Sequence, residues 1–499
     1  MNFMMKKLPT NTSNQTMRTR LFSGLRWTGG SQAIQQILNL VWSVVMARVL
    51  APEDFGLLAM ASVFTGIVFF VLDLGLSAAI VQRQNLEERQ ISSVFWINIF
   101  VGLVMTLLGV VLSWPIATFY NNTTLQAVVA ALSCNFIIFS LSSTQTALLK
   151  RQMHFRSLEF RTLIGQLVGI SCSLAMAFWG FGIWSLVGRI LIASVVGTVL
   201  LWSVSGWRPS WGFYWEDVRE LSSFGNDVFI ANLLGYVGRN ADNLLIGKFF
   251  GATDLGYYAM AYNLMMFPVL RFSQVLAGVL FPALSRMQED TEKIKRSWFR
   301  ATRLMGAVTI PLMLGLIALA PQFIQVVYGE KWLPAVLVLQ VLSISGLCQS
   351  VAYLHGTVLL ALGQSRLRLK LNFLSVTLAV VSFLLGLPFG IVGVATCFTV
   401  VNTATTAFSV FKTLECLSSS YIQYVRLLTG VIVAASGMTL AILALVFGFD
   451  LSPSLLLIIA VPGGCVVYIV LLHFVAPSIL NEVFQILPKR FTQRWLKFS

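Results

Sequence analysis

Two stretches of the chain repeat one another: ARVLAPEDFGLLAMA at residues 47–61 and GKFFGATDLGYYAMA at residues 247–261. A shift of 200 residues (254 − 54) places Asp54 on Asp254, and it places the closing Ala-Met-Ala of one stretch on that of the other. The same shift aligns a basic residue near the start of each stretch, Arg48 with Lys248. This likeness predicts that the chain contains two copies of one structural unit.

Two further anchors extend the repeat along the chain. Tyr120 recurs as Tyr328, and the triplet Phe-Gly-Ile at residues 181–183 recurs at residues 389–391. Both shifts are 208 (328 − 120 and 389 − 181). Three anchors in the same order, at a nearly constant spacing, indicate an internal duplication rather than coincidence.

The composition is that of a membrane protein. The 499 residues are 57% hydrophobic and 11% charged, whereas a soluble protein carries roughly 25% charged residues. The apolar residues fall into about fourteen runs of about 20 residues, the length that a helix needs to cross about 30 Å of hydrocarbon. The sequence therefore predicts an all-α polytopic membrane protein with two six-helix lobes, related by a pseudo-two-fold axis along the membrane normal, and two C-terminal helices.

Lysine and arginine residues orient these helices. With the N-terminus in the cytoplasm, the even-numbered loops and both tails hold about 28 of the 34 basic residues, as the positive-inside rule requires. The outer loops hold only Arg48, Lys248 and Lys331. Both termini are therefore predicted to be cytoplasmic. The net charge of +15 comes from these short loops, so we expect no nucleic-acid partner.

The predicted organisation follows the repeat. It comprises a cytoplasmic N-terminal tail (1–25), an N-lobe of helices 1–6 (26–204), a cytoplasmic aromatic linker (205–217), a C-lobe of helices 7–12 (218–413), helices 13 and 14 (421–475) and a cytoplasmic C-terminal tail (476–499).

The first helix of each lobe carries a polar stripe. In the N-lobe, polar residues recur at i, i+3, i+4, i+7 and i+11, which is one face of a helix. The equivalent positions of the C-lobe are also largely polar. Both stripes are predicted to face one hydrated chamber between the lobes, and they consist of Gln32, Gln35, Gln36, Asn39 and Ser43, and of Asn232, Gly235, Tyr236, Arg239 and Asn243.

Six ionisable residues lie at membrane depth. Each costs about 2.5–3.5 kcal/mol at a helix centre when it is unpaired, so each must face protein or water. The six are Asp73, Arg189, Asp227, Arg239, Asp242 and Arg271.

These charges have structural as well as functional interpretations. Arg239 and Asp242, three residues apart, either neutralise one another or act on a solute. Arg271 has no acidic residue nearby in its own helix, which favours a functional role. Arg48 and Lys248, at matching helix ends, either reach the membrane interface as long cations or bind an anion. Asp73 and Asp227 either make helix contacts or take part in coupling to an ion.

Motifs of soluble catalysis are absent from the sequence. It contains no phosphate-binding P-loop, no G-x-S-x-G and no H-E-x-x-H. His154 and His355 have no Cys, His or acidic partner at ligand spacing. We therefore expect no enzymatic activity, no cofactor and no metal site.

Short motifs along residues 20–480 resemble one family. They are ARVLAPEDFG (47–56), FVLDLGLSAAIVQ (70–82), LKRQMHFR (149–156), DNLLIGKFFG (242–251), LFPALSR (280–286) and YGEKW (328–332). This ordered set resembles the bacterial Wzx-type polysaccharide transporters of the multidrug/oligosaccharidyl-lipid/polysaccharide exporter superfamily, particularly the branch of the colanic acid translocase.

The resemblance implies a flippase of the bacterial inner membrane. Its substrate would be an undecaprenyl-diphosphate-linked oligosaccharide repeat unit, moved from the cytoplasmic to the periplasmic leaflet for exopolysaccharide or O-antigen synthesis. The two lobes would form a V-shaped pair that opens alternately inward and outward, and the partners would include a polysaccharide polymerase and chain-length machinery. On this interpretation the diphosphate contacts are Arg239, Arg271, Arg48, Lys248 and Arg189, the sugar contacts are Gln32, Gln35, Gln36, Asn39, Asn232, Tyr236 and Asn243, and the candidates for proton or ion coupling are Asp73, Asp242 and Asp227.

Three alternatives remain open on the sequence. One is a cation-coupled multidrug exporter of the same architecture, which would need acidic residues in its chamber. Another is a flippase for the peptidoglycan precursor. The third is a membrane scaffold or polymerase partner without transport, which would not need aligned polar stripes in both lobes.

Overall fold

A computed structural model of the chain describes residues 14–73, 80, 81, 83, 87–215, 226–479 and 482. Every regular element within these ranges is a helix, as the sequence predicts. The chain forms two compact units, which meet in sequence between Val237 and Gly238. Each unit is described by itself.

Among its described residues, unit 1 (residues 1–237) contains six long helices and the beginning of a seventh. Their described bounds are α1 Asn14–Val49, α2 Pro52–Asp73, α4 Glu88–Tyr120, α5 Thr124–Arg151, α6 Phe155–Phe178 and α7 Ile183–Val204.

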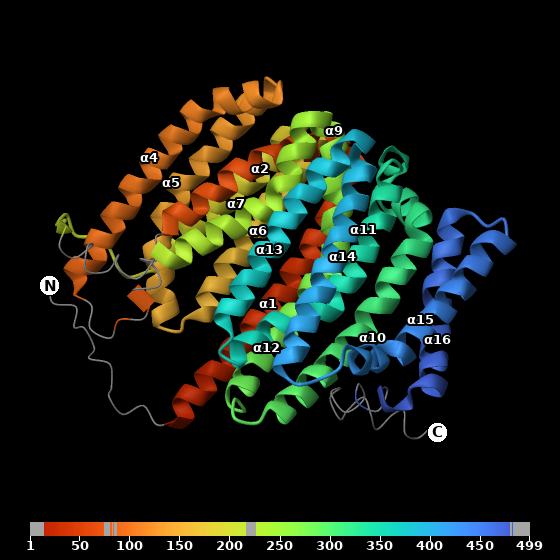
Figure 1. Ribbon diagram of the computed structural model, residues 1–499. Helices are drawn as coiled ribbons and strands as arrows, with labels where there is room; N and C mark the ends of the chain where they lie inside the picture. The colour runs from red at the N-terminus through yellow and green to blue at the C-terminus, as the bar shows by residue number, and fades with distance from the viewer. Residues whose placement is uncertain are drawn as a thin grey trace. The chain divides into compact units, whose positions relative to one another are not determined.

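Small residues allow α4 and α5 to pack closely along their length (Figure 1). A Cβ atom added to Gly102 would lie 2.7 Å from the Cβ of Ser140, and one added to Gly109 would lie 2.7 Å from the Cβ of Ser133. In each helix the two positions are seven residues apart, so they fall on one face. Such contacts between small residues bring membrane helices together where no hydrophobic driving force acts between them.

The predicted aromatic linker packs against α4 in its described part. The ring of Trp211 stacks on that of Trp96 with centroids 5.2 Å apart. Trp96 Nε1 donates to the carbonyl oxygen of Ser210 at 2.8 Å, and the Tyr214 backbone N–H donates to Ser93 Oγ at 3.1 Å. The linker is therefore held against the first turns of α4.

Unit 2 (residues 238–499) contains the remaining helices. Their bounds are α10 Thr291–Phe323, η1 Ile324–Tyr328, η2 Glu330–Trp332, α11 Ala335–Ala352, α12 His355–Ala361, α13 Ser365–Gly386, η3 Leu387–Phe389, α14 Gly390–Cys416, α15 Tyr421–Gly448 and α16 Pro453–Val475.

A long helix, α9 (Asn226–Ser285), begins in unit 1 and continues into unit 2. It breaks at Gly251, whose backbone angles are φ 85° and ψ −175°. Only glycine adopts this region readily. The sequence predicts two separate spans here, 218–250 and 256–284, and the break falls at the boundary between them.

The C-terminal helices α15 and α16 share a core with α10. Tyr468 donates its hydroxyl to the carbonyl oxygen of Ala307 at 2.7 Å, and Tyr424 donates to that of Val351 at 2.8 Å. The Trp298 side chain is fully buried beside the ring of Tyr424, with centroids 5.4 Å apart. These two helices, which lie outside the repeat, thus belong to the packing of unit 2.

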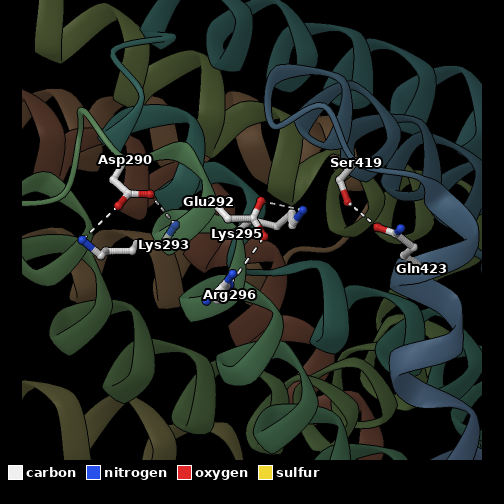
Figure 2. Close-up of polar contacts among 7 residues, drawn as sticks. All are labelled: Asp290, Glu292, Lys293, Lys295, Arg296, Ser419 and Gln423. Carbon is white, nitrogen blue, oxygen red and sulfur yellow. Dashed lines mark hydrogen bonds and ion pairs between the residues drawn. The ribbon is translucent and has the colours of Figure 1, made fainter.

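Charged residues surround the start of α10 (Figure 2). Asp290 precedes the helix and accepts the backbone N–H of Lys293 at 2.9 Å, as an N-cap residue does. This bond, together with the Lys293 ammonium, lowers the pKa of Asp290 below its usual value. Glu292 pairs with Lys295 at 2.7 Å.

The backbone supports the internal repeat. Asn121, which ends α4, has φ 55°, and Gly329, which stands 208 residues later, has φ 98°. Gly182 and Gly390, again separated by 208, have φ values of 53° and 72°. The packing is also parallel: α4 packs on α5 as α10 packs on α11, and α6 packs on α7 as α13 packs on α14. The turns of the two copies therefore occur at equivalent positions of the repeat.

Eleven helical segments among the described residues are long and apolar enough to cross a membrane. Two of them, residues 238–285 and 365–416, are 48 and 52 residues long, and each contains a break in its helix. Helix α1 is not among the eleven, because its polar stripe lowers its hydropathy. The protein is thus a multi-pass membrane protein, and the number fourteen stays a prediction.

Candidate functional site

The structure describes most of the predicted site residues. The side chains of Asp73, Asp227 and Asn232 lie outside the described residues. The others lie in unit 1 on α1, on α7 and at the start of α9, and in unit 2 along the rest of α9.

Glycine residues determine how closely α6 approaches α7. A Cβ atom on Gly165 would lie 2.8 Å from the carbonyl oxygen of Ala193, and one on Gly169 would lie 2.9 Å from that of Arg189. Gly165 and Gly169 are four residues apart and share one face of α6. The close crossing fixes the position of the α7 backbone from which Arg189 projects.

Arg189 links α7 to the polar stripe of α1. Its Nη2 donates to Asn39 Oδ1, and its guanidinium lies over the ring of Trp42, 3.7 Å from the centroid. Trp42 Nε1 in turn donates to Ser173 Oγ of α6 at 3.2 Å. The sequence predicts Arg189 and Asn39 as site residues, and the structure brings them together. The sequence analysis does not single out Trp42 as a site residue, although Trp42 lies three residues after Asn39 on the same face of α1.

Gln35 forms a second contact between α1 and α6. Its Nε2 donates to Ser31 Oγ at 2.9 Å and to Glu159 Oε2 at 3.3 Å. Its Oε1 accepts from Gln166 Nε2 at 3.3 Å. Two of the five residues of the α1 stripe, Gln35 and Asn39, are therefore bonded to α6 and α7 within unit 1. Glu159 and Gln166 belong to this network, and nothing in the spacing of the sequence signals them.

The remaining residues of the α1 stripe are less engaged. The Gln32 side chain is exposed, and that of Gln36 is half-buried.

Tyr236, at the start of α9, contacts α2. It donates its hydroxyl to the carbonyl oxygen of Ser62 at 2.7 Å. Gly66, one turn further along α2, provides the space, since a Cβ atom there would lie 1.9 Å from the Tyr236 hydroxyl.

In unit 2, Asp242 has a tyrosine partner. The carboxylate is buried, with 3% of the residue exposed, and Asp242 Oδ2 accepts the Tyr258 hydroxyl at 3.1 Å. The Tyr258 ring stacks on that of Tyr262 with centroids 6.2 Å apart. The hydrogen bond between Tyr258 and Asp242 joins the two arms of α9 across the break at Gly251. Asn243, the next residue after Asp242, is half-buried.

Two arginines of α9 are exposed on unit 2. Arg239 stands in the first arm of the helix and Arg271 in the second. Each is more than ten residues from the nearest end of its arm, so each lies well inside the apolar stretch. A cation at that depth must contact water, a polar group or an anion rather than lipid tails.

The matching cations of the repeat differ in burial. Arg48, next to the last residue of α1, is exposed, and Lys248 in α9 is half-buried. Among the described residues, no three His, Cys, Asp or Glu side chains converge in a way that could hold a metal ion. The predicted site residues offer amides, a hydroxyl, guanidinium groups, an ammonium and the Asp242 carboxylate; amides and guanidinium groups suit sugars and phosphates.

Sequence comparisons identify similar proteins. Residues 45–337 match the family described as polysaccharide biosynthesis protein. The teichuronic acid biosynthesis protein TuaB of Bacillus subtilis (strain 168) is 30% identical over 70% of this chain and 72% of its own length. The lipopolysaccharide biosynthesis protein WzxC of Escherichia coli (strain K12) is 28% identical over 82% of this chain and 84% of its own length. The predicted resemblance to Wzx-type transporters is confirmed.

Solved structures share the fold. The lipid II flippase MurJ, in an inward closed conformation, superposes with a TM-score of 0.73 at 14% identity, covering 91% of this chain and 99% of that one. An inward-facing multidrug resistance MATE family transporter superposes with a TM-score of 0.63 at 14% identity, covering 77% of this chain and 94% of that one. The predicted exporter architecture is therefore confirmed at the level of the fold.

Proposed function

Because the chain belongs to the polysaccharide biosynthesis protein family, we propose that it is a flippase for a polyprenyl-diphosphate-linked oligosaccharide. It moves the repeat unit from the cytoplasmic to the periplasmic leaflet of a bacterial inner membrane, with both of its termini in the cytoplasm. The family match carries this proposal, and the exposed arginines at membrane depth support it. The chain acts as a transporter, not as an enzyme, and passes its product to a polysaccharide polymerase.

The chemistry of the cargo requires such a protein. Sugar hydroxyls and a diphosphate cannot cross hydrocarbon unaided, because burying polar groups without hydrogen-bond partners costs several kcal/mol for each group. A transporter must replace the lost water with protein donors and acceptors. Amide side chains suit the sugar, and guanidinium groups suit the diphosphate because they form paired, charge-assisted hydrogen bonds.

Arg239 and Arg271 are the diphosphate residues in this proposal. Both are exposed within the apolar stretches of α9, so an anion can reach them. Arg189 is engaged by Asn39 and Trp42, which favours a positioning role. Arg48 and Lys248 provide cations at the outer end of the path.

Alternating access completes the proposed mechanism. The chain is built as two compact units, and MATE transporters of this fold have been solved in inward-facing and outward-facing conformations. A change in the relation of the two units would expose the arginines to one leaflet and then to the other. Asp242 is the proposed coupling residue that the structure describes, and Asp73 and Asp227 are the other candidates.

The proposal is tested by removing the two cations. Arg239→Ala and Arg271→Ala are expected to insert normally in the membrane, while surface polysaccharide falls and lipid-linked repeat units accumulate in the cytoplasmic leaflet. Lipid extraction and mass spectrometry of a deletion strain carrying each variant measure this accumulation. Arg296→Ala provides a control, because that side chain is exposed at the start of α10 and pairs only weakly, at 3.5 Å, with Glu292.

The result also separates the alternatives. Normal export by the double variant would remove both arginines from the site. Unchanged lipid-linked intermediates in the deletion strain, together with loss of resistance to cationic drugs, would favour the multidrug exporter. Accumulation of the peptidoglycan precursor would favour the other flippase.

A further inference from the structure

Two arginines of α10 converge on one carboxylate from the C-terminal part of unit 2. Arg303 Nη2 donates to Glu482 Oε1, and Arg300 Nε lies 3.8 Å from the same oxygen. The two arginines are three residues apart, so they share one face of α10. Glu482 is 179 residues from Arg303 in sequence and follows α16. Two distant segments of unit 2 therefore meet through an oxyanion.

The neighbouring cation of α10 has an acidic partner on its own helix. Arg296, one turn before Arg300, pairs with Glu292 at 3.5 Å (Figure 2). No Asp or Glu occurs between residues 293 and 329, so the local sequence supplies no counter-charge to Arg300 or Arg303. A carboxylate is brought to these two arginines from elsewhere in unit 2.

The two arginines lie at the depth of lipid phosphates. Arg303 stands 20 residues (323 − 303) before Phe323, the last residue of α10, which is about 30 Å of helix. This length equals the hydrocarbon thickness of a typical bilayer, about 30 Å. The charge pattern predicts that the start of α10 is cytoplasmic. Arg300 and Arg303 therefore fall in the headgroup region of the cytoplasmic leaflet.

The Glu482 carboxylate fills this position incompletely. Both guanidinium groups contact its Oε1 atom, whereas a guanidinium group pairs best with two oxygens of an oxyanion. A phosphate has enough oxygens to offer each arginine its own. The Arg300 side chain is 53% exposed, while those of Arg303 and Glu482 are 21% and 20% exposed. An anion can therefore approach from the side of Arg300.

The other copy of the repeat holds a following segment without cations. With the shift of 208, Arg300 falls on Ser92 and Arg303 falls on Phe95 of α4. Ser92 Oγ accepts the backbone N–H of Ser210 in the linker at 3.1 Å. A serine thus holds the segment in unit 1, so arginines at these positions are not a requirement of the fold.

Glu482 ends a segment that reaches into the core of unit 2. Ile479, three residues earlier, is 2% exposed and belongs to the core that α10, α15 and α16 share. Release of Glu482 from the arginines removes the ion pair beside this buried residue. Occupancy of the arginines is therefore coupled to how firmly Ile479 is held.

We propose that Arg300 and Arg303 form a binding site for the phosphate of an anionic lipid in the cytoplasmic leaflet, and that Glu482 occupies the site when no such lipid is bound. Basic groups at this membrane surface attract anionic headgroups. The bound lipid displaces Glu482 and loosens the segment around Ile479. The site uses different residues from the arginines of α9, and it does not depend on the identity of the cargo.

Reactivity of an introduced thiol tests the displacement. Ile479→Cys is placed in the full-length chain with its six natural cysteines replaced by alanine, and the purified protein in phosphatidylcholine nanodiscs is treated with N-ethylmaleimide. Dioctanoyl-phosphatidylglycerol is expected to speed the labelling about fivefold, which corresponds to the loss of one hydrogen bond of ordinary strength. Dioctanoyl-phosphatidylcholine, which has no net charge, is expected to leave the rate unchanged.

Two further thiols serve as controls. Ser478→Cys, at the exposed neighbouring position, measures the effect of the added lipid on thiol reactivity itself. Val431→Cys lies on α15 in the same core, where Val431 is fully buried, so it detects general loosening of unit 2. Phosphatidylglycerol is expected to speed the labelling of neither one.

Arginine variants of the Ile479→Cys chain identify the site. Arg300→Gln is expected to raise the half-effective concentration of dioctanoyl-phosphatidylglycerol about tenfold, because it removes one charge-assisted contact to the phosphate and leaves the bond between Arg303 and Glu482. Arg296→Gln is the matched control one turn earlier, and it is expected to change that concentration by less than about twofold.

A carboxylate variant tests the competition. Glu482→Gln is expected to make labelling of Ile479→Cys fast without any anionic lipid, because the competing charge is absent. Glu415→Gln makes the same change of charge at the end of α14, where Glu415 pairs with Lys412, and it is expected to leave the labelling slow.

Each outcome decides the assignment. Acceleration by phosphatidylglycerol or by undecaprenyl diphosphate, weakened by Arg300→Gln and not by Arg296→Gln, supports the site and identifies the lipid. Acceleration by inorganic pyrophosphate but by neither lipid overturns it, and so does equal acceleration at Val431→Cys. Labelling that no anion speeds also overturns it, because Glu482 then serves only to hold the C-terminal segment. None of these failures touches the flippase proposal, which the lipid-linked intermediates of the deletion strain test separately.

Discussion

The two units place their arginines in opposite ways on a shared plan. In unit 1, Arg189 on α7 reaches across to Asn39 and Trp42 of the first helix. With the shifts of the repeat, Asn39 corresponds to Arg239 (39 + 200), and Arg189 corresponds to Cys397 (189 + 208). The arginine therefore lies on α7 in unit 1 and on α9, the equivalent of α1, in unit 2. Unit 1 uses its arginine to fasten the first helix, whereas unit 2 exposes an arginine on that helix.

The comparison extends to the helix pairs that carry these residues. In α6 and α7 the closest approach is in the middle of the helices, at Gly165 and Gly169. In α13 and α14 it is at the connecting turn, where a Cβ atom on Gly386 would lie 2.6 Å from the Cα of Val394. Close contact at the middle makes unit 1 dependent on small residues there. The same duplicated fold thus supports one copy in which an arginine bonds to the first helix and another copy in which the arginine on that helix is exposed.

Gly169→Val is expected to have the largest effect on this contrast. The added Cβ atom would lie 2.9 Å from both the Cβ of Ala193 and the carbonyl oxygen of Arg189, so α6 and α7 must separate. Overpacking of this kind costs about 3 kcal/mol. Thermal unfolding of the purified protein in detergent, together with the yield of folded protein, measures the loss. Gly278→Val, made where a Cβ atom has free space, is expected to be tolerated, and equal damage by both would refute the special role of the α6–α7 contact.

Arg189→Ala comes next in size. It removes a charge-assisted hydrogen bond and leaves Asn39 and Trp42 without their partner, with a loss of about 2 kcal/mol. Arg189→Lys keeps the charge but not the planar stacking, so it should recover only part of the loss. Unfolding midpoints compare these variants with Cys397→Ala, the change at the equivalent position of unit 2. A larger effect at Cys397 than at Arg189 would contradict the proposed asymmetry.

Tyr258→Phe tests the hydrogen bond between Tyr258 and Asp242 in unit 2. The change removes the hydroxyl that donates to Asp242 and leaves a buried carboxylate with one hydrogen bond fewer, at a cost of about 1 kcal/mol. The double variant Tyr258→Phe/Asp242→Leu should recover stability, because neither partner is then left unsatisfied. A double-mutant cycle of unfolding free energies measures the coupling. Strict additivity would mean that the two side chains do not depend on one another.

Asp290→Ala is expected to have the smallest effect, and one that depends on pH. Asp290 is exposed, and its bond to the Lys293 backbone lowers its pKa in the folded protein. The carboxylate therefore stabilises the folded state above its unfolded pKa of about 4, and this contribution fades as the pH falls through the lower folded value. Unfolding midpoints of variant and parent should differ near pH 7 and converge in acid. A difference that grows as the pH falls would reverse the assigned sign.

Much of the fold could be predicted from the sequence, because the features that determine it are local. Apolar runs define the helices: the predicted span 91–119 is observed as Glu88–Tyr120. The repeat anchors fall at turns, where Asn121 and Gly329 have the same sign of φ. The spacing of the α1 stripe correctly places Asn39 and Gln35 on a polar face.

The partners of these residues could not be predicted. Arg189 is 150 residues from Asn39 in sequence, and no periodicity in either helix specifies that α7 lies beside α1. Polar residues in a span indicate that something must satisfy them, but only the packing shows what does.

The open space beside Gly197 has an evolutionary consequence. Because a Cβ atom there meets no other atom within 4 Å, small side chains at this position are expected to accumulate while the scaffold survives. Gly165 and Gly169 tolerate no such drift. Orthologues from bacteria with different surface glycans should therefore diverge at position 197 before they diverge at Gly165 and Gly169, so that a lineage can acquire a new coat polymer without rebuilding its exporter.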